Sequence, residues 1–249
     1  MIKLLACIFL ITVSFKTTFA RNVGETEITT EEGIEVFQNE KFYLLKKNVE
    51  IISDEFNLKG QIVKIFFEKD LYDIKEIEAH DNVTFESKIN QINGYGENVN
   101  IKMDEEEIAI NGNDSKLYLE KSKMYSNGKI VVNNLKGTFF INGLESKLIS
   151  DEIFISGYKI DGIFEMIDNK RNVSELTVED EKEVNIKTDN INMFSKKAIY
   201  NKTNSIIELF EDVKIIRGNE IVTGDYGILD TNKNSYKVSS KNSNKVKVI

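Results

Sequence analysis

The sequence predicts an all-β protein, built as an antiparallel stack of hairpin-like rungs. Three observations favour this fold: a strand unit that recurs along the chain, an apolar–polar alternation from Ile34 onwards, and four Asn-Gly pairs. The chain of 249 residues contains no proline. Long strand ladders therefore lose no backbone N–H donors, and turns must be made by Gly, Asn, Asp and Ser.

The recurring unit begins with Asn or Asp followed by valine. It occurs at 48–51 (Asn-Val-Glu-Ile), at 82–85 (Asn-Val-Thr-Phe) and at 212–215 (Asp-Val-Lys-Ile). After a short polar segment, second strands are expected over 58–67, 92–102 and 221–229. Supersecondary units that recur in this way are typical of stacked repeats. Such a stack has two open ends and one long apolar inner face.

The Asn-Gly pairs are interpreted as hairpin turns, because both residues tolerate positive φ. They lie at Asn93-Gly94, Asn111-Gly112, Asn127-Gly128 and Asn142-Gly143.

The chain divides into four parts. Residues 1–20 resemble a cleavable secretory signal, with Lys3 before an apolar core and a small-x-small site ending at Ala20. Residues 21–33 are polar and are expected to form a flexible arm. The β domain is predicted over 34–240, with residues 168–185 interpreted as a charged loop or insertion, and 241–249 form a tail.

No group of residues predicts catalysis, a cofactor or a metal site. His80 is the sole histidine and Cys7, inside the expected signal, is the sole cysteine. The histidine and cysteine side chains needed for a transition-metal centre are therefore missing, and a Ser-His-Asp triad is not indicated either. The acidic run Asp104–Glu107 is interpreted as a solvated turn. The net charge of −8, without a basic stripe, argues against nucleic-acid binding.

The inner face is the candidate binding surface. Residues of one parity in a strand project to one side of a sheet. On this basis the predicted lipid-binding residues are Val49, Ile51, Val83, Phe85, Val99, Ile101, Phe139, Ile141, Ile153, Ile155, Val213, Ile215 and Leu229. An ordinary sandwich core is the alternative interpretation of the same pattern.

Several of these segments resemble one family. Residues 79–85 read A-x-x-N-V-x-F, residues 94–97 read G-x-G-E, and the layout returns over 198–201, 212–215 and 223–226. The chain thereby resembles the LptA (OstA-like) family of periplasmic lipopolysaccharide carriers. The likeness is good over 34–110 and 190–240 and poor over 111–189.

The resemblance implies a β-jellyroll opened into a V-shaped trough, in which the acyl chains of lipid A lie. It implies a periplasmic carrier that bridges the inner and outer membranes, with LptC-like and LptD-like β-jellyroll partners and head-to-tail self-association. Edge strands are expected at 34–45 and 226–238, and substitutions at Val213 or Ile228 are expected to weaken assembly. A membrane-anchored LptC-like component and a ligand-free structural β-repeat protein are the alternatives.

Overall fold

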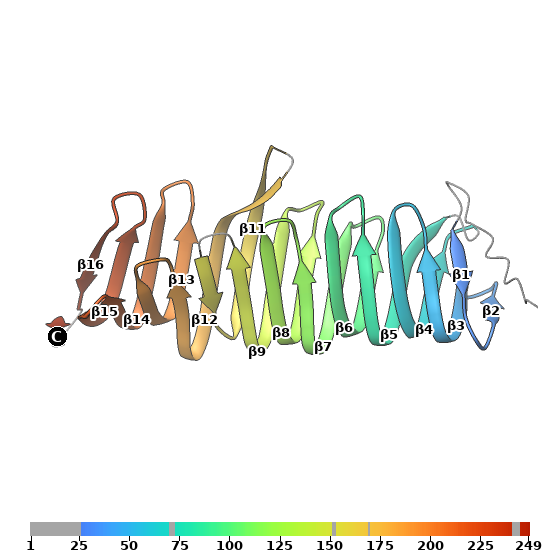
Figure 1. Ribbon diagram of the computed structural model, residues 1–249, viewed down its shortest axis with the longest axis horizontal. Coiled ribbons are helices and arrows are strands. Elements are labelled where there is room, and N and C mark those ends of the chain that lie inside the picture. The colour runs from blue at the N-terminus through green and yellow to red at the C-terminus, as the bar shows by residue number, and fades with distance from the viewer. Residues whose placement is uncertain (1–25, 70–72, 151–152, 169, 241–244) are drawn as a thin grey trace, which may run out of the picture.

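The computed structural model describes residues 26–69, 73–150, 153–168, 170–240 and 245–249. The described chain is an elongated stack of strands that runs from the N-terminal to the C-terminal end of the molecule (Figure 1). All strands belong to one 17-stranded antiparallel sheet, and no described residue is helical. The predicted all-β fold class, an antiparallel β-jellyroll, is therefore confirmed.

The strands follow one another as a meander, so that most neighbours in the sequence are neighbours in the sheet. Their bounds are β1 Glu27–Thr29, β2 Ile34–Phe37, β3 Phe42–Ile52, β4 Phe56–Phe67, β5 Ile74–Ser87, β6 Ile92–Lys102, β7 Glu107–Tyr118, β8 Ser122–Asn133, β9 Thr138–Ser150, β10 Ile153–Ser156, β11 Lys159–Ile167, β12 Lys170–Lys187, β13 Asn192–Asn201, β14 Ile206–Arg217, β15 Glu220–Asp230, β16 Ser235–Ser239 and β17 Lys247–Val248.

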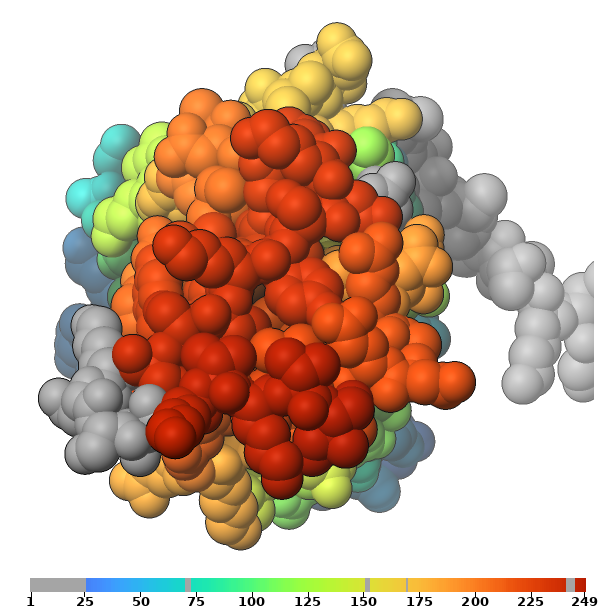
Figure 2. Space-filling model, turned by 90° about the vertical axis from the view of Figure 1, so that its left-hand side faces the viewer, coloured from blue at the N-terminus to red at the C-terminus, as the bar shows by residue number. Residues whose placement is uncertain are grey.

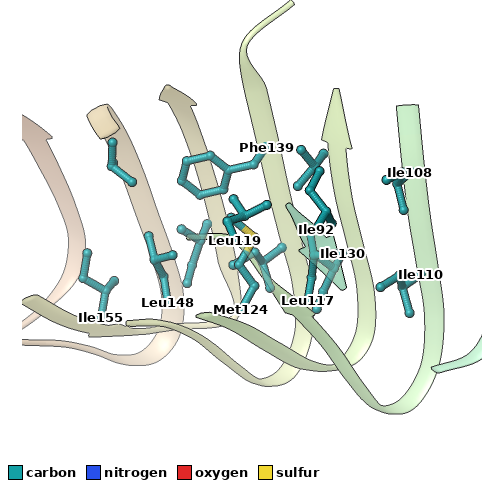
Figure 3. Close-up of a cluster of buried hydrophobic side chains, with 14 of the residues drawn as sticks. Ile92, Ile108, Ile110, Leu117, Leu119, Met124, Ile130, Phe139, Leu148 and Ile155 are labelled. Carbon is teal, nitrogen blue, oxygen red and sulfur yellow. The ribbon is translucent and has the colours of Figure 1, made fainter. Parts of the chain in front are cut away.

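Most of these strands bend near their middle. The pairing register shifts at a central position in nearly every pair, for example between Lys46 and Val49 in β3 and between His80 and Val83 in β5. Such bulges bend a strand and increase its local twist. The bent strands wrap around a common interior, and the bends are visible in the close-up of the core (Figure 3).

The bends divide the sheet into two limbs that enclose the interior. Limb A contains β2, β11 and β16, and limb B contains β1, β10 and β17. Each of the longer strands contributes one half to each limb, as the pairings show. The bends join the limbs on one side. The hairpin turns of the two limbs therefore form two rims along the other side, which we call the mouth.

The repeated Asn-Val or Asp-Val unit marks the bend itself. Asn48, Asn82 and Asp212 have φ of 49°, 56° and 52°, and in each case the preceding residue also has positive φ. Asn and Asp tolerate the left-handed region better than other residues with a side chain. The valine that follows is the first inward-facing residue of the next limb.

The Asn-Gly pairs do not form the hairpin turns that the sequence predicts. Asn93-Gly94 lies inside β6, and the other three pairs lie at or beside the bends of β7, β8 and β9. Gly112 and Gly143, with φ of 116° and 130°, supply the positive φ that the bends require. The preference of these pairs for positive φ was identified correctly, but the prediction that they form hairpin turns was wrong.

Buried serines close several bends from the inside. Ser115 donates to the Gly112 carbonyl at 2.8 Å, Ser126 to that of Asn142 at 2.8 Å, and Ser146 to that of Gly143 at 2.8 Å. These carbonyls lie beside the positions where the register shifts. A buried polar group without a partner is costly, so the serines stabilise the bends.

The region interpreted as a charged loop belongs to the sheet. Most of residues 168–185 lie in β12, which is 18 residues long, and only the acidic stretch between Glu179 and Val184 departs from the ladder, as the bend of this strand. Part of the predicted arm, Glu27–Thr29, is also a strand, β1. The expected signal at 1–20 lies outside the described residues. Of the acidic run at 104–107, residues 104–106 lie in the turn between β6 and β7 as expected, and Glu107 begins β7.

Each end of the stack is an edge made from two short strands. β1 and β2 pair with the two halves of β3, and β16 and β17 pair with β15. Val213 lies in β14, and Ile228 in β15 pairs on both sides. The positions suggested for testing assembly are therefore internal, and edge residues must replace them. Figure 2 shows the C-terminal end, with the last strands in red.

Candidate functional site

The candidate site is the apolar interior between the limbs. Inward-facing residues of successive strands form one continuous hydrophobic cluster from Leu45 in β3 to Leu229 in β15. Figure 3 shows side chains from neighbouring strands, among them Ile110, Leu117 and Ile130, pointing into this shared space. The interior therefore runs along the stack as one apolar layer.

All of the predicted lining residues lie in or against this cluster. Two of them, Ile101 and Ile153, are partly buried and pack on its margin. The other members are at most 4% exposed: Val49, Ile51, Val83, Phe85, Val99, Phe139, Ile141, Ile155, Val213, Ile215 and Leu229. The sequence pattern therefore placed them on the correct face, and their contact with lipid stays a prediction.

The interior is filled over most of its length. Ile65, Ile110, Met124 and Ile141 are each completely shielded from solvent. Neighbouring side chains rather than open space surround them, as in a close-packed core. The interior of the trough that the resemblance implies is thus occupied by side chains along most of the stack. Space for a ligand is found instead where the limbs separate.

A hollow of about 470 Å³ lies at the mouth between β9 and β15. Its volume falls within the roughly 300–1,000 Å³ typical of ligand pockets. Its apolar lining is continuous with the core: Leu148, Ile153, Val173, Leu176, Ile191 and Leu229. Polar side chains of both rims surround the opening, among them Lys121, Asp189, Lys202 and Asn234. The hollow thus combines an apolar floor with a hydrated border.

Contacts between the rims border this hollow on two sides. Toward the N-terminal end, Arg171 of limb A reaches the limb B turns: its Nη1 lies 2.9 Å from the Asn90 carbonyl and 3.4 Å from Glu120. Toward the C-terminal end, Arg217 Nη1 lies 3.4 Å from the Asn234 carbonyl. The open stretch of the mouth therefore lies between these two contacts.

A tyrosine reinforces the C-terminal contact. The Tyr236 hydroxyl of β16 donates to Glu220 of β15 at 2.9 Å. Burial, followed by this hydrogen bond to a carboxylate, raises the pKa of Tyr236 above its ordinary value. The hydroxyl therefore stays protonated and keeps donating at neutral pH.

A second hollow, of about 490 Å³, lies around β11 in limb A. Its lining consists mainly of outward-facing residues, such as Val131, Phe140 and Ile199, together with acidic side chains such as Asp161 and Glu175. This lining is less continuous with the core than that of the mouth hollow. We therefore take the mouth hollow as the candidate site.

Sequence reasoning identified only Ile153 and Leu229 among the residues of the mouth hollow. Val173 and Leu176 were missed because they lie in the stretch interpreted as a loop. The alternation of Leu176 and Val178, which are 2% and 0% exposed, was the available signal. Arg171 carries no sequence signal, since its contacts come from turns distant in the chain.

Two further observations concern the described residues. They contain no helix that is long and apolar enough to cross a membrane. They also contain no group of three or more His, Cys, Asp or Glu side chains able to hold a metal ion.

Together the fold and the site define a class: an elongated β-jellyroll with an apolar interior that is accessible from one side. Residues 28–138 match a family model described as the LptA/(LptD N-terminal domain) LPS transport protein. The resemblance to the LptA-like family is therefore confirmed over this part of the chain. The description of this family model is that of a transport protein.

A solved structure also matches, but weakly. It is the crystal structure of LptH from Pseudomonas aeruginosa, described as the LptA homologous periplasmic component of the conserved lipopolysaccharide transport device. The match covers 90% of this chain and 94% of LptH, at 7% identity and a TM-score of 0.23. A search of curated proteins finds no match.

Proposed function

We propose that this protein is a periplasmic carrier that shields the acyl chains of lipopolysaccharide in its apolar interior. The observation that carries the proposal is the mouth hollow, which opens from solvent onto the hydrophobic core. The family match over residues 28–138 supports lipopolysaccharide as the cargo. Each buried methylene contributes about 0.8 kcal/mol, so shielding about ten of them supplies roughly 8 kcal/mol.

The lining residues act by excluding water and need no reactive group. Acyl chains enter at the mouth hollow and displace the floor side chains toward their neighbours, while the polar headgroup stays at the hydrated rims. The residues predicted to contact lipid deeper in the interior, such as Val83, Phe85 and Ile215, extend this path along the stack. The carrier holds its cargo, and an energy-supplying partner in the inner membrane moves it.

Photo-crosslinking in cells tests the proposal. A photoreactive residue is placed at Phe139, Ile215 or Leu229, all inward-facing, and at Ile163, which is 43% exposed on β11, as the control. We expect lipopolysaccharide adducts from the inward positions and few from Ile163. Adducts of equal yield at all positions, or none at the inward ones, would contradict the proposal.

The two edges of the sheet are the surfaces through which we propose that the protein assembles. We propose that the β1–β2 edge of one molecule pairs with the β16–β17 edge of the next, and that LptC-like and LptD-like jellyrolls pair with the ends of the row. Ile34 and Val36 of β2 are 49% and 48% exposed, unusual for apolar strand residues at a free edge. Head-to-tail pairing of this kind extends without closing.

Cleavage after Ala20 would separate the periplasmic carrier from the LptC-like alternative. N-terminal sequencing of the exported protein is expected to begin at Arg21. A retained N-terminus would favour the membrane-anchored alternative.

A further inference from the structure

The β11–β12 hairpin extends past the rim of the sheet. β11 pairs with β9 only as far as Ile163, opposite Thr138, whereas it pairs with β12 to Ile167, opposite Lys170. The described residues 164–167 and 170–173 therefore belong to the part of the hairpin that no longer pairs with β9. Figure 1 shows this hairpin projecting beyond the others.

The base of this hairpin is packed, not loose. Phe164 and Val173 are each 8% exposed and belong to the core cluster. The Phe164 ring lies 4.6 Å from that of Phe139, and its backbone N–H donates to the Gly137 carbonyl at 2.8 Å. The hairpin thus has a defined position above the interior.

Its second strand reaches both rims. Arg171 Nε donates to Asn134 of limb A at 3.1 Å, while Arg171 Nη1 contacts Asn90 and Glu120 of limb B. The Arg171 and Glu120 side chains are 10% and 13% exposed, so solvent screens this ion pair little. Next to it, Lys121 Nζ lies 3.4 Å from Asn172 Oδ1.

We propose that this hairpin is a strap across the mouth and that Arg171 is its latch. In the present structure the strap is closed and marks the N-terminal border of the mouth hollow. Lys121, Arg171, Asn172 and Val173, which belong to the strap or its contacts, also line that hollow. Release of Arg171 from limb B frees the strap and connects the hollow with the interior beneath β7 and β8. The proposal rests on the proposed function, and it adds a control of access by a named residue.

The test measures uptake of cis-parinaric acid, a fluorescent fatty acid, by the full-length protein. Lys121→Cys and Asn172→Cys, in a chain with Cys7→Ser, are bridged by a short bismaleimide reagent that contains a cleavable disulfide. We expect the bridge to slow uptake by about tenfold or more, since only molecules with an open strap are competent, and cleavage to restore the rate. Equal uptake rates in the bridged and the cleaved protein would refute the proposal that the hairpin is a strap.

A second variant tests the latch. Arg171→Ala is expected to speed uptake, whereas Lys170→Ala, which removes a charge from an exposed side chain of the same hairpin, leaves the rate unchanged. Equal acceleration by both variants overturns the assignment to Arg171. Wild-type protein that takes up no probe contradicts the proposed function itself, so the two failures are distinguishable.

Discussion

The bends of the strands can be tested through one asparagine. Asn82 has a φ of 56° and is exposed, and its side chain accepts an exposed hydrogen bond of 3.4 Å from the Tyr95 hydroxyl. The left-handed region costs a β-branched residue such as valine roughly 1–2 kcal/mol, whereas the short polar side chain of asparagine tolerates it. We expect Asn82→Val to reduce the free energy of unfolding by about that amount. For a chain of this size each kcal/mol lowers Tm by roughly 2–4 °C.

Two matched variants isolate the backbone effect. Asn82→Gly also loses the hydrogen bond but tolerates positive φ, so it should cost much less than Asn82→Val. Asn93 lies in β6, and its φ is outside the left-handed region. Asn93→Val should therefore be neutral or stabilising, since valine favours strands. Thermal and urea unfolding measure all three. If Asn82→Val is no more harmful than Asn93→Val, the assignment of the Asn-Val unit to the bends is wrong.

Three further predictions concern the core, an ionisable tyrosine and the edge. Ile141→Ala, at a position with no solvent exposure, should cost about 2–5 kcal/mol in urea unfolding; a loss below about 1 kcal/mol would indicate a loosely filled interior. Burial and the 2.7 Å hydrogen bond to Glu208 raise the pKa of Tyr226 to about 12, above the value near 10 of an unfolded tyrosine. Its stabilising contribution is therefore complete below pH 10 and is lost between about pH 10 and 12, and Tyr226→Phe should flatten that part of the stability profile. Val36→Lys at the edge should reduce self-association in sedimentation velocity experiments, whereas Ile62→Lys, 37% exposed within the sheet, should not; equal effects would argue against pairing through β2.

The fold class and the inward face were predictable because they depend on local periodicity. Alternation determines which side of a strand is apolar, and Val49, Val83 and Val213 all face inward as expected. The position of the bends was not predictable in the same way. Asn-Gly reports a preference for positive φ, which a hairpin turn and a bend inside a strand both require.

The mouth hollow was largely missed, for a different reason. Its lining comes from β9, β10, β12, β13, β15 and several turns, so it exists only once the limbs are assembled. The charged bend of β12 also concealed a strand, because Asp180 and its acidic neighbours interrupt the alternation that continues from Val178 to Val184. A charged interruption of a few residues is thus compatible with an unbroken strand when it falls at a bend.

The filled interior and the proposed lipid path are compatible if the limbs resist separation at the bends but can separate at the mouth. The bends join the limbs covalently in nearly every strand and are closed by buried serines, so that side is expected to resist opening. Across the mouth, the described contacts are individual side-chain interactions, chiefly those of Arg171, Arg217 and Tyr236. Each such hydrogen bond contributes about 0.5–3 kcal/mol, so these few contacts together are of the same order as the roughly 8 kcal/mol available from shielding ten methylenes. Binding of the proposed cargo would therefore offset much of the cost of parting the rims, while the bends keep the sheet intact.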